Sequence, residues 1–226
     1  MAHERTEQLI VELARDAAPV TRLPPMVVRL ARWIAMALAA AAAGVWLIGA
    51  REDLWPALTT PSVFASVALT LVAAATAGAA ALRLSVPGAD QARYSRWVPI
   101  AATASWVAVL WTLSREAGVS TEALLREPFH LACGARVVAL SLLPSLALVS
   151  GVRRGFALDR VWAAVLAVLA GSALAAGSVQ LVCPIDRPAH LLVAHALPML
   201  LLAALGGLAA SRWIAASATR ATRQAA

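Results

Sequence analysis

Residues 161–182, VWAAVLAVLAGSALAAGSVQLV, form an uncharged apolar stretch. A helix of about 20 residues spans the hydrocarbon core of a bilayer, and such residues satisfy their backbone hydrogen bonds within the helix. Five more apolar runs lie along the chain, and none alternates like a barrel strand. The sequence therefore predicts an all-α integral membrane protein with a bundle of six transmembrane helices. The predicted spans are Leu30–Ala50, Val63–Leu82, Trp97–Leu113, Leu131–Val152, Val161–Val182 and Leu191–Ile214.

The overall composition agrees with a membrane protein. Hydrophobic residues make up 61% of the chain and charged residues 14%, which is far from the balance of a soluble domain. If the N-terminus is cytoplasmic, fourteen arginines lie on the cytoplasmic side and four on the opposite side. The positive-inside rule then places both termini in the cytoplasm. The fourteen are Arg5, Arg15, Arg22, Arg29, Arg32, Arg83, Arg93, Arg96, Arg153, Arg154, Arg160, Arg212, Arg220 and Arg223, and the four are Arg51, Arg115, Arg126 and Arg187.

The net charge of +7 has a simple explanation in this topology. Arginines on the inner face attract anionic membrane lipid, so we expect lipid contacts and no direct nucleic-acid binding. The chain divides into a cytoplasmic N-terminal arm (residues 1–29), a six-helix transmembrane domain (30–214) and a cytoplasmic C-terminal tail (215–226). No loop is long enough for a soluble catalytic domain. Because P-loop, Gly-x-Ser-x-Gly and His-Glu-x-x-His motifs are also missing from the sequence, we do not expect an enzyme.

The N-terminal arm has the pattern of a short amphipathic helix. In residues 6–17, TEQLIVELARDA, the apolar residues Leu9, Ile10 and Leu13 recur at helical spacing, while acidic residues such as Asp16 take the other face. Thr6 is the candidate N-cap, and the prolines that follow at positions 19, 24 and 25 end the helix. Such a helix can dock in a groove of a partner protein or lie on the inner leaflet. Its acidic residues disfavour contact with anionic lipid.

The only two cysteines, Cys133 and Cys183, fall at the ends of different spans. The fourth and fifth spans form an antiparallel hairpin, so both thiols should lie at the same height on the outer side. His130, His190 and His195 are expected on that side as well. Thiols facing an oxidising compartment can form a disulfide or share a metal ion. The alternative for each residue taken alone is ordinary packing, because cysteine is a small apolar residue and histidine an amphipathic one.

Two charged residues add to this predicted outer site. Arg136 lies three residues after Cys133 within an apolar run, where a charge is costly and tends to be functional, paired or snorkelling. Asp186 lies in the loop between Cys183 and His190 and supplies a carboxylate. Thiolate and imidazole ligands suit soft metal ions such as zinc, cadmium or copper. We expect no obligatory cofactor, only transient binding of such an ion.

Two other classes of protein remain as alternatives at this point. A membrane redox protein that passes electrons from thiols to quinone would need a second thiol pair, and the chain has no Cys-x-x-Cys. A small transporter would need ionisable groups deep in the spans, and Arg136 is the main candidate of that kind. The sequence lacks a second thiol pair and has few ionisable groups deep in the spans, so a non-enzymatic sensor is the preferred interpretation.

Short motifs occur in a fixed order along the whole chain. They are Leu9-Ile10, Leu13, Asp16, Pro19-Val20, Arg22-Leu23-Pro24-Pro25, Gly49, Arg51, Asp53-Leu54, Val86-Pro87-Gly88, Cys133, Cys183-Pro184, His190-Leu191-Leu192 and His195. This ordered set resembles the NrsF family. The resemblance implies a six-helix bacterial inner-membrane protein that acts as the anti-sigma factor of an extracytoplasmic-function (ECF) sigma factor of the sigma-F type. It also implies that the arm and the inner surface hold the sigma factor, and that Cys133 and Cys183 help to perceive heavy-metal or oxidative stress.

Overall fold

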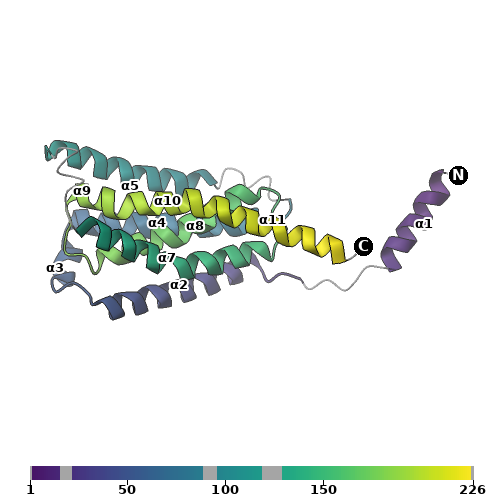
Figure 1. Ribbon diagram of the computed structural model, residues 1–226, viewed down its shortest axis with the longest axis horizontal. Coiled ribbons are helices and arrows are strands. Elements are labelled where there is room, and N and C mark those ends of the chain that lie inside the picture. The colour runs from purple at the N-terminus through teal and green to yellow at the C-terminus, as the bar shows by residue number, and fades with distance from the viewer. Residues whose placement is uncertain (1, 16–21, 89–95, 119–128, 225–226) are drawn as a thin grey trace.

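The computed structural model describes residues 2–15, 22–88, 96–118 and 129–224, and within these ranges it contains helices and no strand. Figure 1 shows the helices packed side by side into one elongated bundle, except for the N-terminal helix, which lies apart from it. The prediction of an all-α fold is confirmed. The elements are α1 (Ala2–Arg15), α2 (Met26–Ile48), α3 (Leu54–Thr59), α4 (Pro61–Leu84), α5 (Trp97–Glu116), α7 (Phe129–Arg153), α8 (Arg160–Gln180), α9 (Pro188–His190), η2 (Leu191–Ala196), α10 (Leu197–Leu201), η3 (Leu202–Gly206) and α11 (Gly207–Gln224).

Six helical segments of the described chain are long and apolar enough to cross a membrane, as predicted. The first begins at Met26, four residues earlier than expected, directly after Pro25. The helix includes Arg29, which precedes the predicted span, because this side chain has hydrogen-bond partners. Arg29 donates to the Ser85 hydroxyl at 3.1 Å and to the Gly151 carbonyl at 2.7 Å. These bonds connect the start of α2 to the ends of two other spans. The spans are Met26–Ile48, Pro61–Leu84, Trp97–Glu116, Leu131–Arg153, Arg160–Gln180 and Pro188–Ala215.

Helix α8 is the core of the bundle. In its most apolar stretch 83% of the residues are buried, compared with 17–44% in the other five spans. A helix that is apolar on every side is suited to this central position. Its Ala, Gly and Ser residues also let neighbouring backbones approach closely, which is how helices pack within a bilayer.

Two glycines of α8 mark places where neighbouring helices approach it closely. A side chain at Gly171 would lie 2.7 Å from the backbone nitrogen of Ser145 on α7. A side chain at Gly177 would meet the hydroxyl and Cβ of Thr70 on α4. Helices α4 and α7 therefore both pack closely against α8, and the contacts at Gly171 and Gly177 leave no room for a larger residue.

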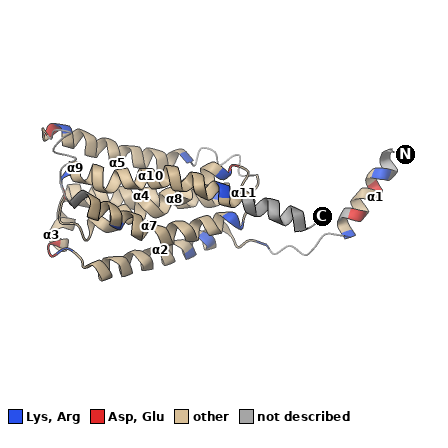
Figure 2. Ribbon diagram, viewed as in Figure 1, with Lys and Arg blue, Asp and Glu red and all other residues tan. Residues whose placement is uncertain are grey.

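The two ends of the bundle differ in composition. Both ends of the chain lie at one end, which we call the termini end, while α3 and α9 lie at the opposite end, which we call the cluster end (Figure 1). Arginines gather at the termini end, where α4 and α7 finish and α2 and α8 begin (Figure 2). Arg96 there stacks on Trp97 and Trp162 at 5.5 and 5.0 Å, as expected of aromatic residues near a membrane interface.

Helix α1 differs from the prediction at its start. It begins at Ala2, so Thr6 lies inside the helix and is not its N-cap. Leu9 and Ile10 are 56% and 54% exposed, which leaves two large apolar side chains uncovered. The side chain of Leu13 and all of Asp16 lie outside the described residues.

Candidate functional site

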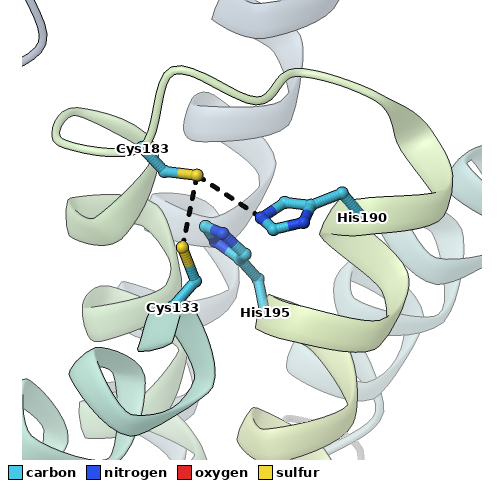
Figure 3. Close-up of side chains that lie close together, drawn as sticks. All are labelled: Cys133, Cys183, His190 and His195. Carbon is cyan, nitrogen blue, oxygen red and sulfur yellow. Dashed lines mark hydrogen bonds between the residues drawn. The ribbon is translucent and has the colours of Figure 1, made fainter. Parts of the chain in front are cut away.

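Four side chains of metal-binding type, from two distant parts of the chain, meet at the cluster end. Cys133 comes from the beginning of α7, Cys183 from the loop just after α8, His190 from α9 and His195 from η2. All four residues are buried, and one ligand atom from each lies within 4.8 Å of the other three. Figure 3 shows the two thiols and the two imidazoles directed toward a common centre. We call this group the Cys–His cluster.

The sulfur of Cys183 is central among these groups. The Cys133 thiol donates a hydrogen bond to it at 3.4 Å, and Nε2 of His190 lies 3.4 Å from it on the other side. The backbone nitrogen of Cys183 donates to the Val179 carbonyl at 2.8 Å, which ties the residue to the end of α8. The pKa of the Cys183 thiol is lowered, first by the Cys133 hydrogen bond and then by the hydrogen bond with His190, while burial opposes this shift. This sulfur is therefore well suited to act as a thiolate ligand.

A π-helical turn explains how both histidines reach the same centre. Residues five apart in an α-helix point about 140° away from each other. Between His190 and His195 the chain instead forms η2, where the Leu197 nitrogen donates to the Leu192 carbonyl five residues earlier. This wider turn places the two imidazole centroids 5.6 Å apart. Pro198 follows directly, and because proline clashes with the carbonyl four residues before it, the turn upstream widens.

The second ring nitrogen of His195 fixes its orientation. Its Nδ1 lies 3.2 Å from the Ala176 carbonyl on α8. A carbonyl only accepts, so Nδ1 carries the proton, and Nε2 of the neutral ring keeps a free lone pair. Among the described residues this buried Nε2 has no hydrogen-bond partner. When the ring is neutral, this arrangement directs its unprotonated nitrogen toward the two thiols.

Arg51 holds the loop that carries Cys183. All five of its side-chain N–H groups are used: three reach Asp53 or the Cys183 carbonyl and two reach Asp186, at 2.7 to 3.1 Å. Its backbone nitrogen also donates to the Leu181 carbonyl at 3.1 Å. The pKa of Arg51 is raised by these carboxylates, and the pKa of Asp53 is lowered by Arg51. We call Arg51, Asp53 and Asp186 the Arg51 clamp.

The comparison with known protein families follows the resemblance seen in the sequence. A family model described as NrsF, negative regulator of sigma F, matches residues 13–215. The chain belongs to the NrsF family. The protein is thus a negative regulator of a sigma factor, and the match covers every span, the Cys–His cluster and the Arg51 clamp. No curated protein and no solved structure gives a significant match.

The structure of this NrsF protein brings together only some of the residues predicted for the outer site. It joins Cys133, Cys183, His190 and His195 in one cluster. Asp186 is not among them, because both of its carboxylate oxygens accept from Arg51. Arg136 is partly buried and acts on the Cys133 thiol from the next turn of α7. The side chain of His130 lies outside the described residues.

Sequence reasoning missed the Arg51 clamp, although a signal for it was present. Arg51 is one of only four arginines expected on the outer side, and an aspartate follows two residues later. An arginine and an aspartate directly after a transmembrane span indicate an ion pair there. The second partner of Arg51, Asp186, is 135 residues away in the chain, and no local pattern connects the two.

Proposed function

We propose that this NrsF protein sequesters an ECF sigma factor at the cytoplasmic face of a bacterial inner membrane and releases it on a periplasmic heavy-metal or oxidative signal. The family supports the regulation of a sigma factor. The observation that carries the sensing part is the Cys–His cluster, which lies at the end of the bundle opposite the arginine-rich termini. A signal received at that end would have to cross the membrane to reach a cytoplasmic partner.

The direction of the bundle follows from its charges. The described arginines gather at the termini end, and cytoplasmic segments carry the excess of arginine in membrane proteins. We therefore assign the termini end to the cytoplasm, where arginines contact anionic lipid, and the cluster end to the periplasm. With an even number of spans, both termini share the cytoplasmic side.

Helix α1 is the surface we propose for sigma-factor binding. Leu9 and Ile10 are more than half exposed, on a short helix with acidic residues. An amphipathic helix with uncovered apolar residues suits a hydrophobic groove on a partner. Leu13 continues the same ridge by its spacing. Asp16 follows Leu9 by seven residues, so in a continuous helix it would stand at the edge of the ridge and not on the opposite face.

The chemical signal is proposed to act on the cysteines. Cys133 and Cys183 lie 3.4 Å apart and are buried, so a soft metal ion such as zinc, cadmium or copper, or a thiol oxidant, would change both at once. Arg136, His190 and His195 lie near enough to alter thiol reactivity or to help hold an ion. Metal binding is a transient event in this proposal, and no obligatory cofactor is required.

The arm offers a direct test of the partner. Leu9→Asp, alone and with Leu13→Asp, should release the sigma factor from the full-length protein, because losing a large anchor at an interface typically costs about 1 to 4 kcal/mol. Val11→Asp is the matched control. Val11 is 50% exposed like Leu9, but it lies about 160° to 200° around the helix from Leu9 and Leu13.

The measurement is co-purification of the cognate sigma factor with detergent-extracted protein. Equal membrane insertion of all variants must be shown by their yield in the membrane fraction. Sigma factor retained by the double variant as fully as by the wild type would exclude the arm as the binding surface. Loss of the sigma factor with Val11→Asp alone would show that the binding face lies on the other side of α1.

A further inference from the structure

We infer that Cys133, Cys183, His190 and His195 form a complete four-ligand site for one divalent metal ion of the zinc and cadmium class, and not a disulfide centre. The use of this ion as a signal rests on the function proposed above, while its binding does not. The donor set is two sulfurs and two imidazole nitrogens, contributed by α7, the loop after α8, α9 and η2.

The spacing of the four ligand atoms fits a tetrahedral ion. Zinc–sulfur and zinc–nitrogen bonds of about 2.3 and 2.0 to 2.1 Å place tetrahedral ligands roughly 3.3 to 3.8 Å from one another. The Sγ atoms of Cys133 and Cys183 are 3.4 Å apart, and Sγ of Cys183 is 3.4 Å from Nε2 of His190. All four ligand atoms lie within 4.8 Å of one another. Small side-chain movements toward the centre shown in Figure 3 therefore complete the coordination.

His195 gives the independent evidence for a metal ion. Histidines that bind metals usually donate their other ring N–H to a backbone carbonyl or carboxylate, which sets the tautomer and aims the free nitrogen. His195 has this arrangement, with Nδ1 directed to the Ala176 carbonyl at 3.2 Å. The residue is fully buried, and its Nε2 lacks a hydrogen-bond partner within the described part of the chain. A metal ion at the centre of the cluster gives that lone pair its partner.

The charge of the site also selects a divalent ion. Binding replaces the two thiol protons with two sulfur–metal bonds, so that two thiolates neutralise one M²⁺ and two protons leave. The imidazoles are neutral ligands, and the resulting site carries no net charge where it is buried. Asp186 cannot add a negative charge, because the Arg51 clamp holds both of its oxygens.

A disulfide would involve the two cysteines of the cluster but neither histidine. Its formation removes two electrons and two protons from the thiols and requires an external oxidant. It leaves Nε2 of His195 buried and still without a partner, which is unfavourable for a polar atom. Magnesium and calcium ions do not fit this donor set, since both require oxygen ligands and the cluster offers sulfur and nitrogen. The geometry thus favours zinc and cadmium.

Cobalt provides the test, because tetrahedral Co²⁺ with thiolate ligands has visible absorption bands that zinc lacks. Full-length protein in detergent, reduced and freed of metal with a chelator, is titrated with Co²⁺. We expect one ion per chain, a thiolate-to-cobalt charge-transfer band, tetrahedral ligand-field bands, and loss of all of these on addition of Zn²⁺ or Cd²⁺. His195→Gln and His190→Gln should each weaken binding by about 100-fold or more, beyond the 10- to 100-fold that loss of a supporting partner usually costs.

Ser178→Ala serves as the matched control. Ser178 is buried on α8 near the cluster end, and within the described residues its hydroxyl bonds only to the Leu174 carbonyl of its own helix. Absence of the tetrahedral spectrum in the wild-type protein overturns the site, whatever the variants do. If both histidine variants bind Co²⁺ with the affinity of the wild type, the histidines are not ligands. The four-ligand site is then wrong, and disulfide formation becomes the preferred role of the cysteines.

A second measurement is independent of the variants' folding. Wild-type protein loaded with Zn²⁺ should react with a thiol-alkylating reagent at least about tenfold more slowly than the metal-free protein. Equal rates would contradict metal ligation by the cysteines. The outcomes also separate the two proposals: protein that binds Co²⁺ but no sigma factor disproves the function proposed above, and protein that binds sigma factor but no Co²⁺ disproves only the metal site.

Discussion

Arg51 and Asp186 are joined at two points, with Nη1 to Oδ1 at 2.7 Å and Nη2 to Oδ2 at 2.8 Å. This pair ties the residues just after α2 to the loop that carries Cys183. Helix α2 runs from this tie to the termini end, where Arg29 bonds Gly151 and Ser85 and where the chain connects to α1. The loop that carries Cys183 and the helix that follows the arm are therefore mechanically connected.

The first prediction concerns this connection. Asp186→Ala should lower the free energy of unfolding by about 1.5 to 3 kcal/mol, the usual contribution of hydrogen bonds to charged groups. It should also weaken release of the sigma factor by metal while leaving Co²⁺ binding intact, since Asp186 is not a ligand. Asp53→Ala is the control, because it leaves the link between α2 and the loop in place. Thermal unfolding in detergent and a sigma-dependent reporter measure the two effects, and a wild-type response from Asp186→Ala would exclude the clamp as the connection.

The second prediction treats the cysteines as one unit. Cys133→Ser and Cys183→Ser should each abolish or lock the reporter response to cadmium, chromate or a thiol oxidant as completely as the double substitution, because partners in one interaction are not additive. A change of about tenfold in sigma affinity, roughly 1.4 kcal/mol, is enough for a transcriptional response. If both single variants respond like the wild type to every inducer, the cysteines only contribute to packing and the sensing model is wrong.

The third prediction concerns packing around α8. Gly171→Ala would place a methyl group 2.7 Å from the Ser145 nitrogen and 2.9 Å from its Cα, so α7 must move. Overpacking of this kind typically costs about 1 to 3 kcal/mol. Gly151→Ala is the control, because its methyl group would meet only Leu82 Cδ2 at an ordinary 3.8 Å. Thermal unfolding should show a lower midpoint for Gly171→Ala only, and equal midpoints would contradict the close approach of α7 and α8.

The fourth prediction concerns orientation. Glu116→Cys at the cluster end and Phe156→Cys at the termini end both change exposed residues. In a background of Cys133→Ser and Cys183→Ser, a membrane-impermeant maleimide applied to spheroplasts should label the first variant and spare the second until the membrane is opened. The reverse pattern would place the Cys–His cluster in the cytoplasm and end the periplasmic sensing proposal.

Much of the fold could be predicted because long apolar runs have few alternatives in a bilayer. The span at residues 161–182 contains no charge, and it became the central helix α8. The ends of a membrane-spanning helix are harder to predict where an arginine lies near the membrane interface. Arg29 looked like the end of the arm, but its bonds to Ser85 and Gly151 allow the helix to begin at Met26.

The candidate site was predictable in part. Topology alone placed Cys133 and Cys183 at one height, and the structure brings their sulfurs to 3.4 Å. His190 and His195 lie close together because of a π-helical turn, and the hydrophobic pattern of the sequence does not predict such a turn. Arg51 depends on a partner from a distant loop. Tertiary contacts of these kinds leave no local trace in one sequence.

The π-helical turn also has an evolutionary consequence. A π-turn is equivalent to an α-helix that has gained one residue, so its removal needs only a one-residue deletion. Without Val193, the two imidazoles would stand four residues apart and share one face of an ordinary α-helix. Homologues with His-x-x-x-His at this point could therefore carry the same ligand pair, and an alignment that matches the histidines must open a gap of one residue between them.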